Sequence, residues 1–95
     1  MKSKSELVDA FCAITDRDEM ERFIHEILTE NELEDVIFRW RLMKDLFHGE
    51  TQRNIAKKHG ISLCKITRGS RILKDKKSIS LKLIKKLEKQ NDRNI

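Results

Sequence analysis

The stretch 52–73 constrains the fold most, because its apolar residues recur at helical spacing on both sides of one glycine. Gly60 can adopt the positive φ that ends a helix, and the hydroxyl of Ser62 can cap the helix that follows. Ile55, Ala56 and His59 fall on one face of the first helix, and Ile66 and Leu73 form an apolar stripe on the second. This pattern predicts a helix-turn-helix over residues 51–74.

The exposed side of the second helix in this stretch favours binding to DNA. Its polar residues are Lys65, Thr67, Arg68 and Arg71, whose donors suit phosphates and base edges. The alternative is a buried helical hairpin whose basic side is only solvated.

The charge of the chain is divided between its two halves. Residues 1–38 hold 4 Lys and Arg against 11 Asp and Glu, net −7, whereas residues 39–95 hold 17 against 5, net +12. The basic half, which contains the expected helix-turn-helix, attracts a polyanion in a salt-dependent way. A membrane surface is the competing polyanion, but no stretch is apolar enough to span a bilayer and no leader begins the chain, so we expect a soluble protein without a membrane partner.

The rest of the chain predicts an all-α fold of about six helices in a single domain, 1–95. Proline is absent, hydrophobic residues make up 38% and charged residues 39%, which suits helices with thin apolar stripes. The apolar positions that mark the other helices are Leu7, Phe11 and Ile14, then Met20, Phe23, Ile24, Ile27 and Leu28, and finally Leu83, Ile84 and Leu87. Thr29 and Glu32 predict a capping box that opens a long central helix ending near His48. Ser78 and Ser80 are expected to cap the last helix, and residues 91–95 to be disordered.

The central helix is apolar on two sides, which predicts a homodimer. One stripe contains Leu33, Val36, Ile37, Trp40, Met43 and Phe47, and the other contains Phe38, Leu42 and Leu46. A helix buried from two directions needs more cover than one chain of this length supplies, so we expect a dimerisation core of about 5–48 and 79–90. The alternative is that the N-terminal helices of the same chain wrap it.

No metal site and no catalytic set is expected. Cys12 and Cys64 are far apart and form no zinc-binding spacing, so both are expected to be free thiols, with Cys12 a small core residue. A redox-sensing role for Cys64 is the lesser alternative. His25, His48 and His59 have no carboxylate or serine at a catalytic spacing, so we expect no enzyme.

Several runs of residues together resemble the tryptophan repressor family. They are LTENE, RWR, HGETQRNIAKKHG and ITRGS, with Leu73 and Lys74 behind, and they cover about residues 28–74. The resemblance implies an intertwined all-helical homodimer. Its two reading heads, the helix-turn-helix of each chain (residues 51–74), would enter successive major grooves of operator double-stranded DNA. Together with the residue types, it indicates DNA contacts from Gln52, Arg53, Leu63, Cys64, Lys65, Thr67 and Lys74. Ala56 stands where the family often has a lysine that contacts a DNA phosphate. Lys57, Lys58 and Lys74 are the lysines expected to take over that contact.

The resemblance also implies a site for L-tryptophan as corepressor. In the family, the equivalent of Arg68 binds the ligand carboxylate and the equivalent of Arg39 stacks on the indole, a pairing that guanidinium chemistry suits. Backbone carbonyls around Glu26 and Leu28 of the partner chain would receive the ammonium. Thr29, Gly69 and Ile72 would line the same pocket, with Ile72 replacing a family serine that helps to hold the ammonium.

The expected function is therefore an L-tryptophan-activated transcriptional repressor in the bacterial cytoplasm, associated with the nucleoid when bound to DNA. Bound ligand would hold the reading head at the spacing that DNA requires. The alternatives are a tryptophan-independent helix-turn-helix regulator of the same family, or a helical protein-interaction module.

Overall fold

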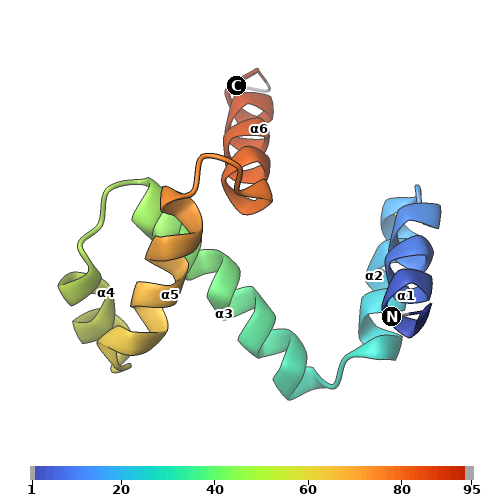
Figure 1. Cartoon of the computed structure of the whole chain (residues 1–95), viewed down its shortest axis with the longest axis horizontal. Coiled ribbons are helices and arrows are strands. Elements are labelled where there is room, and N and C mark those ends of the chain that lie inside the picture. The colour runs from blue at the N-terminus through green and yellow to red at the C-terminus, as the bar shows by residue number, and fades with distance from the viewer. Residues whose placement is uncertain (1, 94–95) are drawn as a thin grey trace. The chain divides into compact units, whose positions relative to one another are not determined.

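The computed structural model describes residues 2–93, and the side chains of residues 2–90 (Figure 1). This part of the chain contains six helices and no strand, which confirms the predicted all-α class. The helices are α1 (Lys2–Ala13), α2 (Arg17–Ile27), α3 (Glu30–Phe47), α4 (Gln52–His59), α5 (Leu63–Lys74) and α6 (Ile79–Arg93). The chain forms two compact units, Met1–Val36 and Ile37–Ile95.

The N-terminal unit holds α1, α2 and the start of α3. Phe11 and Phe23 pack edge to face with their ring centroids 5.2 Å apart, and this contact joins α1 to α2. Asp16 caps α2, because its carboxylate accepts a hydrogen bond from the backbone N–H of Glu19 at 3.1 Å. Cys12 is exposed, so the expectation that it is a core residue is wrong for the single chain. The cause is that α1 buries no residue at all.

The start of α3 has the predicted capping box. The backbone N–H of Thr29 donates to Glu32 Oε1 at 2.9 Å, and the backbone N–H of Glu32 donates to Thr29 Oγ1 at 3.2 Å. The hydrogen bonds from the backbone and hydroxyl of Thr29 lower the pKa of the Glu32 carboxyl. At the other end, α3 gives way to a turn in which Gly49 has a φ of 91°. The predicted boundaries of this helix are therefore confirmed to within one residue.

The core of the C-terminal unit lies where α3, α4 and α5 meet. Leu42, Ile55 and Ile66 are buried there, and Phe38, Leu46, Ala56 and Ile61 pack around them. The His59 ring stands edge-on to Phe38 with centroids 5.1 Å apart. The predicted face of α4 is thus confirmed for Ile55 and Ala56, which pack on one of the two apolar stripes of α3, whereas His59 stays exposed beside Phe38.

The last helix is attached through its N-terminus and one apolar side. The Ser78 hydroxyl accepts a hydrogen bond from the backbone N–H of Leu81 at 3.1 Å, which confirms it as a cap, whereas Ser80 lies inside the helix and caps nothing. Ile84 is buried, and His48 Nε2 lies 2.9 Å from Glu88 Oε1, which joins α6 to the end of α3.

The predicted disorder at the C-terminus is wrong for residues 91–93. The helical hydrogen bonding of α6 continues through Arg93, because nothing in its sequence breaks a helix before that point. Residues 94–95 lie outside the described residues.

Candidate DNA-binding and ligand-binding site

Helices α4 and α5 are joined by a three-residue turn with defined geometry at both ends. The Thr51 hydroxyl caps α4 by accepting from the backbone N–H of Asn54 at 3.1 Å. Gly60 has φ 64° and ψ 35°, the left-handed conformation that glycine adopts without strain. Ser62 occupies the cap position of α5 with an extended backbone but makes no side-chain cap hydrogen bond, so the expectation for its hydroxyl is wrong.

One side of this pair is fixed to α3 and the other is free. Ile55 of α4 and Ile66 of α5 have no exposed surface, so they set the position of both helices against Leu42. The predicted basic side of α5 faces solvent, because its charged side chains lie on the faces of the helix that point away from the buried Ile66. The exposed ones are Lys65, Arg68, Arg71 and Lys74.

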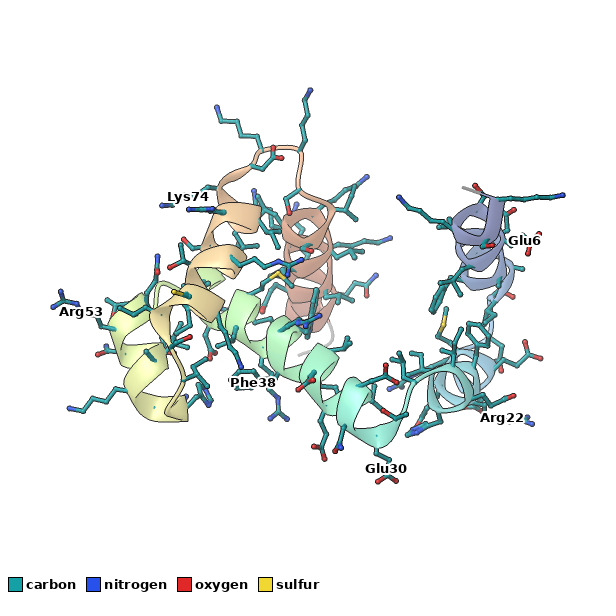
Figure 2. All side chains as sticks on the ribbon, turned by 60° about the horizontal axis from the view of Figure 1, so that its bottom comes forward. Glu6, Arg22, Glu30, Phe38, Arg53 and Lys74 are labelled. Carbon is teal, nitrogen blue, oxygen red and sulfur yellow. The ribbon has the colours of Figure 1, made fainter. Side chains whose placement is uncertain are left out.

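The predicted DNA-contact residues are arranged along this free side, with two exceptions. Arg53, Leu63, Cys64, Lys65 and Lys74 are exposed. Figure 2 shows Arg53 and Lys74 projecting outward from the α4–α5 pair. Gln52 and Thr67 are half-buried, because they contact each other.

The contact between Gln52 and Thr67 leaves little freedom at either side chain. Thr67 Oγ1 lies 2.8 Å from the carbonyl oxygen of Leu63 and 3.1 Å from Gln52 Oε1. A hydroxyl has one proton, so it cannot donate fully to both oxygens. Turning the Gln52 amide over removes this conflict, because its NH₂ then donates to Thr67 Oγ1 while the hydroxyl donates to the carbonyl oxygen of Leu63. The first residue of α4 is therefore held against α5 by a hydrogen bond across the pair.

Of the seven residues expected to bind the ligand, four lie in the C-terminal unit, on two helices that pack together. Gly69 of α5 lies close to α3: a Cβ added there would be 3.5 Å from Met43 Cγ and from Leu46 Cδ1. Arg39 precedes Met43 by about one helical turn on α3, and Arg68 precedes Gly69 on α5. Both arginines are exposed, as is Ile72 at 37%. The two guanidinium groups therefore come from neighbouring segments of α3 and α5.

The other three expected ligand residues belong to the N-terminal unit. They are Glu26, Leu28 and Thr29, at the end of α2 and the start of α3. Glu26 and Thr29 are exposed and Leu28 is half-buried. The Thr29 hydroxyl already accepts a hydrogen bond from the backbone of Glu32.

Met43 is a candidate pocket residue that the sequence reasoning assigned only to the core. It lies beneath Gly69, on the same side of α3 as Arg39, and its flexible thioether can adapt to a flat ring. The sequence contained a signal for it, since Arg39 and Met43 are four residues apart on one helix.

The profile of the Trp repressor protein family matches residues 2–91, which is almost the whole chain. The chain belongs to the Trp repressor family. Two relatives called Trp operon repressor homolog are 39% identical to it over 70 residues. The one from Xylella fastidiosa strain M23 is matched over 73% of this chain and 76% of its own length, and the one from Chlamydia trachomatis serovar D over 68% and 74%. None of the solved structures matches this chain.

Membership of the Trp repressor family identifies the chain as a repressor-type regulator. The family regulates transcription and is not enzymatic, which confirms the expectation that this protein is no enzyme. Tryptophan is in general the corepressor in this family. Within residues 2–93, no helix is long and apolar enough to cross a membrane.

Proposed function

We propose that this protein is a homodimeric transcriptional repressor that binds operator DNA through α4 and α5 when L-tryptophan is bound. The observation that carries the proposal is the pair of helices itself. Its inner side is fixed to α3 by Ile55 and Ile66, and its outer side presents exposed basic residues in a chain of the Trp repressor family. A pair of helices used only for packing has no need of that outer side.

In this proposal, the start of α5 and the start of α4 approach the major groove. Lys65, Leu63 and Cys64 open α5, where side chains reach base edges. Arg53 is exposed on α4 and its guanidinium suits a guanine edge or a phosphate. Gln52 and Thr67 stabilise the pair and approach the DNA backbone, and Lys74 contacts phosphate.

The ligand would bind beside the contact of α3 with α5. The Arg68 guanidinium would pair with the carboxylate of L-tryptophan, and the Arg39 guanidinium would stack on its indole above Met43 and Gly69. Backbone carbonyls around Glu26 and Leu28 of the partner chain would accept the ammonium, and Thr29 would line the same pocket. A ligand held on both α3 and α5 stabilises one position of the reading head, and so shifts the population toward the form that binds DNA.

The dimer is supported by apolar surface that the single chain leaves uncovered. Val36 and Ile37 of α3 are 46% and 44% exposed, and Leu83 and Leu87 of α6 are 44% and 46% exposed. We propose that a second copy covers them, with a dimerisation core of about 5–48 and 79–90 in one domain of 95 residues. The cytoplasm is the compartment that a DNA-binding bacterial regulator requires.

A tryptophan-independent regulator is the second candidate, and Ile72 favours it. An isoleucine offers no hydrogen bond to an ammonium, whereas the serine found in the family does. In that case α4 and α5 would bind DNA without a ligand.

One experiment separates the two candidates. Operator sequences are selected from random duplexes with the purified protein and L-tryptophan, and their affinity is then measured with and without saturating L-tryptophan. Calorimetric titration with L-tryptophan and indole analogues gives the ligand affinity independently. Equal operator affinity in both conditions would assign the protein to the tryptophan-independent class.

A further inference from the structure

Helix α6 has one side made only of lysines. Lys82, Lys85, Lys86 and Lys89 recur at intervals of three and four residues, and all four are exposed. We call these residues the lysine face. With a rise of about 1.5 Å per residue, the face is about 10 Å long, which spans two or more phosphates of a DNA strand.

No acidic side chain among the described residues forms a salt bridge with the lysine face. Within residues 2–90, the one contact at salt-bridge distance is that of His48 with Glu88, which is an ion pair only when the imidazole is protonated. Glu88 is also the only acidic residue of α6 in that range, and it is engaged at 2.9 Å by His48. Four like charges at these intervals destabilise an isolated helix, and an anion bound along them would relieve that repulsion.

The remaining sides of α6 explain why the lysine face stays in solvent. Ile84 is 1% exposed and fixes α6 to the rest of the unit, and Leu81 is half-buried beside it. The next side carries Ile79, Leu83 and Leu87, which are 65%, 44% and 46% exposed. At about 100° per residue, the lysine face lies roughly opposite the midpoint of these two apolar sides. A partner chain that covered Ile79, Leu83 and Leu87 would therefore leave the lysines accessible.

The path of the chain from the end of α5 to this face also carries lysines, namely Lys74, Lys76 and Lys77. Residues 74–89 contain seven lysines but only two acidic residues. Asp75 Oδ1 accepts a hydrogen bond from the backbone N–H of Lys77 at 2.9 Å, and Glu88 pairs with His48. Figure 2 shows Lys74 at the start of this path, where α5 ends.

We propose that the lysine face of α6 is a second DNA-binding surface, which contacts phosphates without regard to sequence and is separate from the exposed side of α5. Lysine ammonium groups are compact point charges that suit phosphates. The face has no arginine, asparagine or glutamine with which to read base edges. DNA is the polyanion that the C-terminal unit is already proposed to bind, so the inference shares that premise with the proposed function.

The test uses the full chain with all four lysines changed to glutamine, which keeps helix propensity and removes charge. Affinity for a long random-sequence duplex is measured over a range of salt concentrations. The slope of log affinity against log salt concentration is expected to fall in magnitude by about 2, which makes the loss of affinity between about 50 and 200 mM salt about 16-fold smaller. A charge-matched control carries Lys2→Gln, Lys4→Gln, Arg17→Gln and Arg22→Gln in the N-terminal unit and should keep the slope.

Two further measurements fix the interpretation. A variant with arginine at all four positions should restore the slope, because it restores the charge. The ratio of operator to random-DNA affinity should be the same in the unmutated and glutamine proteins, since only phosphates are involved. An unchanged salt slope in the glutamine variant would overturn the proposal. So would a variant that loses binding to anionic lipid vesicles but keeps its binding to DNA. A protein with no operator preference but with lysine-dependent binding to random DNA would refute the proposed function and leave this inference standing.

Discussion

Thr67 and Gln52 are joined by a hydrogen bond of 3.1 Å, although fifteen residues separate them along the chain. This bond connects the first residue of α4 with the middle of α5, on the side of the pair proposed to face DNA. Two residues expected to contact DNA are thus partners of each other. Their first effect is on the geometry of the reading head.

The bond between Thr67 and Gln52 should be measurable as a coupling energy. Thr67→Val and Gln52→Met each remove this bond while keeping side-chain volume. In the double variant the bond is also lost only once, so the two separate losses should not add. A double-mutant cycle on urea unfolding is expected to give about 0.5–1.5 kcal/mol of coupling. Additive effects of the two changes would mean that the bond does not stabilise the folded protein.

Arg53→Ala and Lys65→Ala should weaken operator binding without unfolding the protein, because both side chains are exposed. A loss of about 1–3 kcal/mol is expected where the side chain reads a base edge. Band-shift titrations against operator and random DNA measure it, with circular dichroism to check folding. An equal loss on both duplexes would reassign Arg53 to phosphate contact.

Arg68→Ala and Arg39→Ala should abolish the dependence of operator affinity on L-tryptophan while leaving non-specific DNA binding largely intact. The reason is that each removes one contact to the ligand, whereas many other cations bind phosphate. Arg41→Ala is the matched control, since Arg41 is also exposed on α3 and lies two residues from Arg39. A tryptophan response that survives in the Arg68 variant would refute the proposed ligand site.

The capping box of α3 should give the Glu32 carboxyl a pKa below its ordinary value of 4.5, because the backbone N–H and hydroxyl of Thr29 stabilise the carboxylate. A lowered pKa in the folded state stabilises the protein above the unfolded pKa, and this contribution is lost as the pH falls through the lowered value. Carboxyl NMR titration measures it. Thr29→Val should raise the pKa of Glu32 only part of the way back, since the larger effect comes from the backbone. An unchanged pKa in that variant would contradict the role of the hydroxyl.

Leu83→Asp should weaken association of the protein, since Leu83 lies on the apolar side of α6 proposed to meet the partner chain. Sedimentation equilibrium should show a dimer for the unmutated chain and a shift toward the 11.3 kDa species, or toward unfolded protein, for the variant. Leu63→Asp is the matched control: Leu63 is 47% exposed against 44% for Leu83, but it lies on the proposed DNA side. Association that is equally weakened by both changes would count against this interface.

The fold was largely predictable because its determinants are local. The Thr29–Glu32 capping box, the positive φ at Gly60 and the spacing of Ile55 and Ile66 each act within a few residues, and all were found as expected. The predictions were wrong where contacts between residues distant in the sequence determine whether a side chain is buried. Cys12 has an apolar sequence context but is exposed, because α1 contributes little more than the contact of Phe11 to its unit.

The exposure of most candidate site residues was predictable from the sequence, but the contacts between them were not. The exposure of Arg53 follows from helical spacing around Ile55, and that of Lys65 and Arg68 from spacing around Ile66. The bond between Gln52 and Thr67 depends on side-chain rotamers on two different helices, which a one-dimensional pattern does not specify.

The small core of the C-terminal unit has a consequence for how this protein can change its target. Leu42, Ile55 and Ile66 form the buried centre, and none of them belongs to the outer side of α5. Residues 63–65 can therefore be exchanged at little cost to folding. A library randomised at these three positions should contain many stable variants with new operator preferences, which makes this reading head a practical starting point for redirecting a repressor.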